Sequence, residues 1–108
     1  MKTLIATTAL ALAMSGAYAQ NVDVSAAEGL MKKSGCFKCH AVAAKKDGPS
    51  YKSVAEKYKG KADAQAALVK HITTGPTVKI DGKEEKHEII KSKDDAEIKN
   101  VVAYILSR

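Results

Sequence analysis

Hydrophobic residues recur at helical spacing through most of this 108-residue chain. An apolar residue at every third or fourth position places one hydrophobic stripe along an α-helix. Three segments beyond residue 50 have this pattern, and we expect an amphipathic helix in each. Their apolar faces consist of Tyr51, Val54, Ala55 and Tyr58; of Leu68, Val69 and Ile72; and of Ile98, Val101, Val102 and Ile105.

Residues that end or cap helices separate these three segments. Gly60 ends the first, Asp63 caps the second, and Gly75-Pro76 interrupts the second before it can continue. The spacing Ser92-x-x-Asp95 is typical of a capping box and predicts the start of the last helix.

A fourth helix is predicted nearer the N-terminus. The spacing Ser25-Ala-Ala-Glu28 is again that of a capping box. Met31 lies within this helix, and Gly35 ends it in a left-handed conformation. Four helices without sustained strand-like alternation predict an all-α domain.

Residues 75–91 fit no helical pattern. The Asp81-Gly82 dipeptide, with β-branched residues on one side, allows a short β-hairpin here. An irregular stretch of this length in a small domain is usually functional.

The first nineteen residues have the organisation of a secretory signal peptide. Lys2 precedes an apolar run, and Ala17-Tyr18-Ala19 forms a small-residue cleavage pattern ahead of Gln20. The apolar run is too short to span a membrane. We therefore expect residues 1–19 to be removed on export to the periplasm, and residues 20–108 to form one small domain.

Lysine supplies almost all of the positive charge. Without Lys2, 17 lysine and arginine residues face 12 acidic residues, which is a formal net charge of +5. Arg108 is the only arginine, and tryptophan is absent. Nucleic-acid surfaces combine arginine with aromatic stacking residues, so this composition argues against a nucleic-acid partner. A lysine-rich surface suits brief docking with an acidic protein, although a merely solvated basic face explains any single lysine equally well.

The only two cysteines lie in the sequence Cys36-Phe37-Lys38-Cys39-His40. A structural zinc site requires a second pair of ligands at matching spacing, and only His71 and His87 are left to supply it. A thioredoxin-like redox pair requires a βαβ unit, which the helical pattern does not provide. A disulfide that closes so short a loop stabilises a protein little.

Haem attachment explains this motif better, because Cys-x-x-Cys-His is the signature of c-type haem. The two thiols add to the two vinyl groups of the haem, and the histidine that follows binds the iron from one face. An added haem also supplies apolar core to a domain with a single phenylalanine. We therefore predict one haem c, attached to Cys36 and Cys39, with His40 as the proximal iron ligand.

Together with its surroundings, this motif makes the chain resemble a small bacterial class I cytochrome c from about Ser25 to Arg108. The resemblance rests on the segments AAEGLMKKSGCFKCHAV, DGPSYKSVAEKYKG and DDAEIKNVVAYILS. It implies about four helices around one haem, with the first and last helices crossing at Met31 and Tyr104. It also implies that the Pro49 carbonyl accepts a hydrogen bond from His40 and fixes its ring; an ordinary helix-initiating proline is the alternative.

The chain departs from this family at the distal face of the iron. Members place a methionine in the loop before the last helix, whereas the methionines here are Met1, Met14 and Met31. Met31 lies five residues before Cys36 and cannot reach the distal face. The place that matches the family methionine is occupied by His87, and an imidazole is a good iron ligand. We therefore predict His87 as the distal ligand.

Three alternatives to His87 stay open at this stage. His71 lies on the third helix at the edge of its apolar face. Lys83, Lys86 or Lys91 would bind iron only if burial lowered the lysine pKa enough to release a proton. An open distal site would instead leave the iron free to bind a small molecule.

Two strong axial ligands leave no position for a substrate, so we expect electron transfer and not enzymatic catalysis. Methionine raises the potential of haem iron, and ligation by two histidines therefore predicts a lower potential than that of methionine-ligated members. The predicted function is that of a monomeric, periplasmic electron carrier with an acidic redox partner. A haem-based sensor, in which nitric oxide or carbon monoxide replaces a labile His87, is the alternative.

Overall fold

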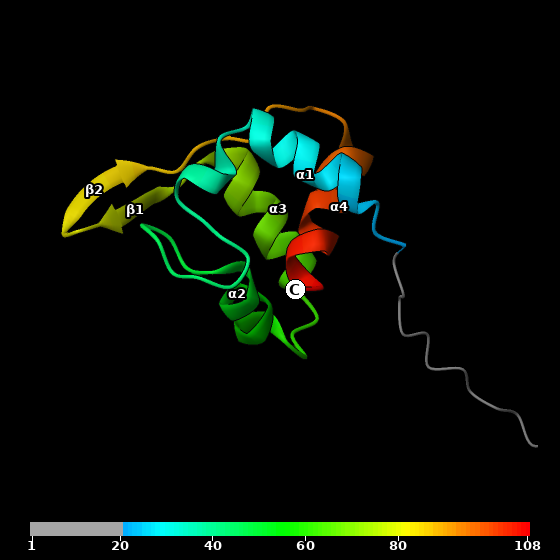
Figure 1. The fold of residues 1–108 in the computed structure, drawn as a ribbon, viewed down its shortest axis with the longest axis horizontal. Helices are drawn as coiled ribbons and strands as arrows, with labels where there is room; N and C mark the ends of the chain where they lie inside the picture. The colour runs from blue at the N-terminus through cyan, green and yellow to red at the C-terminus, as the bar shows by residue number, and fades with distance from the viewer. Residues whose placement is uncertain (1–20) are drawn as a thin grey trace, which may run out of the picture.

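The computed structural model describes residues 21–108, and the predicted signal peptide lies outside the described residues. Within these residues, four α-helices and one antiparallel hairpin form a mostly helical domain, as predicted (Figure 1). No helix of residues 21–108 is long and apolar enough to cross a membrane. The elements are α1 (Val24–Lys33), the 3-10 turn η1 (Cys36–Lys38), α2 (Tyr51–Tyr58), α3 (Ala64–Thr74), β1 (Thr77–Ile80), β2 (Lys83–Lys86) and α4 (Asp95–Leu106).

Helix α4 is the centre of the core, because α1, α2 and α3 all pack against it (Figure 1). Tyr104 of α4 and Met31 of α1 are both almost completely buried in the same hydrophobic cluster. The Tyr104 hydroxyl donates a hydrogen bond of 3.0 Å to the Glu28 carboxylate, which satisfies the polar end of the buried ring. The first and last helices therefore pack together around the two predicted residues.

Both predicted capping boxes are wrong in detail. Asp23, not Ser25, caps α1, and its carboxylate accepts a hydrogen bond of 3.0 Å from the Ala26 N–H. Because α1 begins at Val24, Ser25 is already inside the first turn.

A similar shift occurs at α4. Asp94 is its N-cap, and its side chain accepts hydrogen bonds from the N–H groups of Ala96 and Glu97. Ser92 instead donates to the Glu97 carboxylate at 2.6 Å. Asp63 is the N-cap residue of α3, as predicted, but its side chain makes no capping hydrogen bond.

The hairpin turns at the Asp81-Gly82 dipeptide. Both residues have positive φ, 50° and 77°, which is the combination required by the tight hairpin turn that Asp-Gly favours. The pair nearest the turn is Ile80 with Lys83. The hairpin extends away from the helices (Figure 1), and the loop from β2 to α4 begins with His87.

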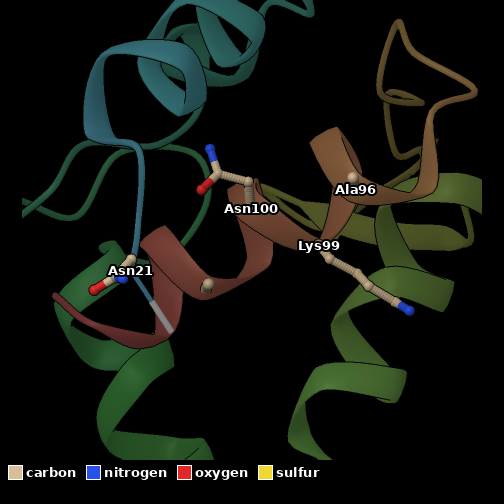
Figure 2. A pocket seen from close by; sticks show the side chains of 5 residues that line it. Asn21, Ala96, Lys99 and Asn100 are labelled. Atoms are coloured by element: carbon tan, nitrogen blue, oxygen red, sulfur yellow. The ribbon is translucent and has the colours of Figure 1, made fainter. Parts of the chain in front are cut away.

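A surface pocket lies where the chain enters α1 beside α4 (Figure 2). Next to it, the Asp23 N–H donates to the Asn100 side-chain oxygen, and the Asn100 amide donates to the Asp23 carbonyl, both at 2.9 Å. These two bonds fasten the start of α1 to α4. No predicted haem-binding residue lines this pocket, whose walls are Asn21, Ala96, Lys99, Asn100 and Ala103.

Candidate haem site

A tight turn after α1 brings the two cysteines and His40 together. Gly35 has a φ of 77°, a left-handed conformation that glycine adopts without strain. The N–H groups of Cys39 and His40 then both donate to the Cys36 carbonyl, at 3.3 and 3.0 Å. The two cysteines are separate, half-buried thiols, and burial raises the pKa of Cys36.

Three neighbours hold the His40 ring. Its Nδ1 lies 2.7 Å from the carbonyl oxygen of Pro49. Because a carbonyl only accepts, Nδ1 carries the hydrogen and the lone pair is left on Nε2. The Tyr51 ring stacks on His40 with centroids 5.1 Å apart and planes 24° apart. A methyl group on Gly48 would lie 2.4 Å from His40 Cε1, so a residue without a side chain is needed there.

The surroundings of His40 favour the neutral form of its imidazole. Burial lowers the pKa of its imidazole below the ordinary value of 6.5, although the hydrogen bond to Pro49 partly opposes the shift. A neutral imidazole with its lone pair on Nε2 is the form that binds metals.

Tyr51 is a site residue that sequence reasoning assigned only to a helix face. It is the first residue of α2 and is 3% exposed. Its ring also meets Phe37 edge to face, with centroids 6.1 Å apart. Burial raises the pKa of its hydroxyl, which therefore stays protonated. The available signal was its position two residues after Pro49, next to the carbonyl that holds His40.

The chain after β2 is fastened to the end of α3. The His87 N–H donates to the Pro76 carbonyl, and the Ile90 N–H donates to the Ile72 carbonyl, both at 2.9 Å. Gly75 follows α3 with a φ of 60°, and a methyl group on it would lie 2.6 Å from the His87 carbonyl oxygen. The backbone that carries His87 thus packs against α3 at a distance that only glycine permits.

The structure brings the His87 ring close to the His40 ring. Their centroids are 6.1 Å apart and their planes are inclined by 48°. His87 Nδ1 lies 2.7 Å from the Glu88 carbonyl oxygen, so here too Nδ1 carries the hydrogen and Nε2 is left with the lone pair.

The alternative distal ligands are placed differently. His71 lies beside His87, with ring centroids 4.4 Å apart in an edge-to-face contact. Within residues 21–108, its ring has no hydrogen bond to a backbone carbonyl like those of the other two histidines. Lys83, Lys86 and Lys91 are exposed, so the burial that would release a proton from a lysine is missing at all three.

The donors present fit one c-type haem. Two unpaired thiols lie within one turn of a metal-competent imidazole. Two imidazoles on opposite sides of one metal ion, at metal–nitrogen distances of about 2 Å, have centroids roughly 6 Å apart, and the rings of His40 and His87 are 6.1 Å apart. Fold and donors together define the class: a small helical domain built to carry one covalently attached haem.

Within this class, the chain belongs to the cytochrome c family, whose model matches residues 24–108. Its homologues include c-551, c2 and c-552 cytochromes, which places it among the class I members. Cytochromes c are electron carriers and not enzymes, and Cys36 and Cys39 bind haem c covalently in such a chain. The predicted family, cofactor and absence of enzymatic activity are thereby confirmed.

Two curated relatives show how far the similarity extends. Cytochrome c-551 from Pseudomonas aeruginosa is 42% identical over 64 residues, which are 59% of this chain and 57% of that protein. Cytochrome c2 from Rubrivivax gelatinosus is 40% identical over 78 residues, which are 71% of this chain and 91% of that protein. The match thus spans little more than half the length of the first relative and nearly all of the second.

Solved structures show the same fold. The class 1 cytochrome MtoD from Sideroxydans lithotrophicus ES-1 is 56% identical with a TM-score of 0.76, over 80% of this chain and 96% of that chain. Cytochrome c552 from Nitrosomonas europaea is 30% identical with a TM-score of 0.58, over 74% of this chain and 96% of that chain.

Proposed function

We propose that this protein is a periplasmic electron carrier whose single haem iron is bound by His40 on one face and by His87 on the other. One observation carries the proposal. Each ring donates its Nδ1 hydrogen to a backbone carbonyl at 2.7 Å, which leaves both Nε2 atoms free, and the ring centroids are 6.1 Å apart. When bound, the haem supplies an iron that accepts and returns one electron.

The protein's own residues would hold that iron in a fixed environment. The carbonyls of Pro49 and Glu88 keep the hydrogen on Nδ1 of each ligand, so each ring presents the same nitrogen at all times. Tyr51 and Gly48 restrict the tilt of the His40 ring. Two fixed ligands leave no position for a substrate, which favours electron transfer over chemistry at the metal.

The proposed ligand pair implies a low reduction potential. A methionine ligand raises the potential of haem iron, and Met31, the only methionine of residues 21–108, is completely buried between α1 and α4. An imidazole in place of methionine favours the ferric state, so we expect a potential below that of methionine-ligated relatives.

Two further features of the chain support the proposed location and the proposed type of partner. The N-terminal signal pattern supports cleavage after residue 19 and export to the periplasm, where residues 20–108 would act as one domain. The excess of lysine supports brief docking of a monomer with an acidic redox protein, because surface charge raises association rates more than affinity.

Absorption spectra of both redox states test the ligand assignment. We expect low-spin spectra in both states, no methionine–iron charge-transfer band, and no immediate change when carbon monoxide is added to the reduced protein, because binding would have to wait until His87 leaves the iron. Rapid carbon monoxide binding to a high-spin reduced state would instead support the sensor or ligand-binding function, in which His87 does not hold the iron.

Substitution of His87 tests the distal ligand directly. His87→Met should raise the midpoint potential and introduce the methionine band, and His87→Ala should produce a carbon monoxide-binding, high-spin ferrous state. Lys86→Ala is the matched control, because it changes the preceding, exposed residue of the same segment. If His87→Ala leaves the spectrum unchanged, the assignment is wrong.

A further inference from the structure

His71 packs directly against the proposed distal ligand. Its ring meets the His87 ring edge to face, with centroids 4.4 Å apart and planes 67° apart. This arrangement is one that aromatic pairs prefer. The function described above gives His71 no role, since it assigns the iron to His40 and His87.

Hydrogen bonds join the backbone segments that carry the two rings. His71 lies in the last turn of α3, and its carbonyl accepts from the Gly75 N–H at 3.3 Å. The same end of α3 holds the His87 backbone through Pro76, at the close approach that Gly75 permits. His71 is therefore held at a constant place relative to the His87 backbone.

The contacts that orient the ring of His40 differ from those that orient the ring of His87. His40 is held by the Pro49 carbonyl, nine residues further along the chain, and is stacked on the buried Tyr51 of α2. His87 donates its Nδ1 hydrogen to Glu88, the exposed residue that follows it in the chain, so this bond does not tie the ring to a helix. The ring contact with His71 is what a helix contributes to the orientation of the His87 ring.

We infer that His71 is a positioning residue, which fixes the rotation of the His87 imidazole about its bond to iron and resists its departure. The inference rests on the proposed ligation by His40 and His87. His71 itself stays off the iron, and its effect depends on the shape of its ring and not on a proton. The angle between the two ligand planes and the lifetime of the His87–iron bond should both depend on His71.

The test compares His71→Ala, His71→Gln and His71→Phe in the haem-loaded protein. Ferric electron paramagnetic resonance reports the angle between the ligand planes through the g-values of the low-spin signal. The rate of carbon monoxide binding to the reduced protein reports how readily His87 leaves. Lys70→Ala is the control, because it alters the preceding, exposed residue of α3.

We expect all three variants to stay low-spin. His71→Ala and His71→Gln should shift the largest g-value and raise the rate of carbon monoxide binding by roughly two- to tenfold, the factor that corresponds to loss of one aromatic contact. His71→Phe restores a flat ring at the same place and should behave like the unchanged protein, as should Lys70→Ala. A role in general stability alone would alter unfolding without moving the g-values.

Two results would overturn the inference in distinguishable ways. If His71→Ala and His71→Gln keep the original g-values and carbon monoxide rate, or if His71→Phe matches His71→Gln, His71 does not position the ring, and ligation by His87 is unaffected. If the His71 variants become high-spin while His87→Ala stays low-spin, His71 is itself the distal ligand, and both this inference and the proposed ligation fail.

Discussion

A histidine binds a metal through the nitrogen that lacks a hydrogen, and here main-chain atoms decide which nitrogen that is. Pro49 and Glu88 each offer a carbonyl oxygen to an Nδ1 at 2.7 Å. A carbonyl belongs to the backbone, so replacing the side chain of either residue leaves the acceptor in place. The choice of Nε2 at His40 and His87 should therefore tolerate substitution at both neighbouring positions, provided that the backbone does not move.

Gly48→Ala should disturb His40, because the new methyl group would lie 2.4 Å from Cε1 and the ring has to move. We expect a loss of about 1–3 kcal/mol in the free energy of unfolding, as for other overpacked sites, and a shifted spectrum. Gly29→Ala is the control. Nothing lies within 4 Å of its new methyl group, and removal of a helical glycine adds roughly 0.5–1 kcal/mol of stability. Equal effects in thermal unfolding would contradict the close packing of Gly48 on His40.

The sequence was informative about the two cysteines that attach the haem and much less so about the side chains that surround the site. The cysteine motif is local, and its chemistry follows from five adjacent residues. The stacking of Tyr51 on His40 depends on how α2 packs, and the contact between His71 and His87 joins residues sixteen positions apart. Helical periodicity describes which face of a helix is apolar, but it does not identify the side chain that a particular residue will meet.

At the scale of elements, local turn chemistry was more predictable than helix starts. Asp81-Gly82 fixes the hairpin because only these two residues must adopt positive φ. The start of α1 depends instead on a distant residue, since Asn100 of α4 exchanges two hydrogen bonds with Asp23. A capping-box spacing could not reveal this tertiary contact, and it placed the cap at Ser25.

Gly75→Ala should loosen the contact between the His87 backbone and the end of α3. The substituted residue pays roughly 1–2 kcal/mol for its left-handed conformation, and its methyl group would lie 2.6 Å from the His87 carbonyl. We expect destabilisation together with partial loss of the low-spin signal. Gly60→Ala separates the two effects, because Gly60 has a φ of 75° but nothing within 4 Å. That control should unfold at lower temperature and keep its low-spin spectrum. Loss of the signal in both variants would contradict a specific role of Gly75 at His87.

Across the whole molecule, positive charge is concentrated in the part of the sequence that contains the haem motif. Residues 29–61 include nine lysines and two acidic residues, whereas residues 62–108 have eight basic and eight acidic residues. The net charge of residues 20–108 therefore comes from the segment around Cys36 and His40. An acidic partner would be drawn first to the surface that this segment forms.

Two charge-reversal pairs test this expectation at equal net charge. Lys38→Glu with Lys45→Glu, near the haem motif, and Lys70→Glu with Lys93→Glu, outside the basic segment, each lower the net charge by the same amount. All four lysines are exposed. We expect the first pair to slow oxidation by ferricyanide roughly tenfold at low ionic strength and the second to slow it much less. Salt at about 1 M should abolish the difference. Equal slowing would mean that only total charge matters.

The central position of α4 has a consequence for when the chain can fold. The other three helices all pack on this twelve-residue segment, which follows all of them in the sequence. Before it is present, Met31 has no Tyr104 to pack with, and Asp23 has no Asn100 to hold it. Within residues 21–108, the main helix–helix contacts of α1, α2 and α3 are with α4 and not with one another. The chain should therefore stay open until α4 is present, which keeps the cysteines accessible for haem attachment and makes any product that lacks α4 an early substrate for proteases.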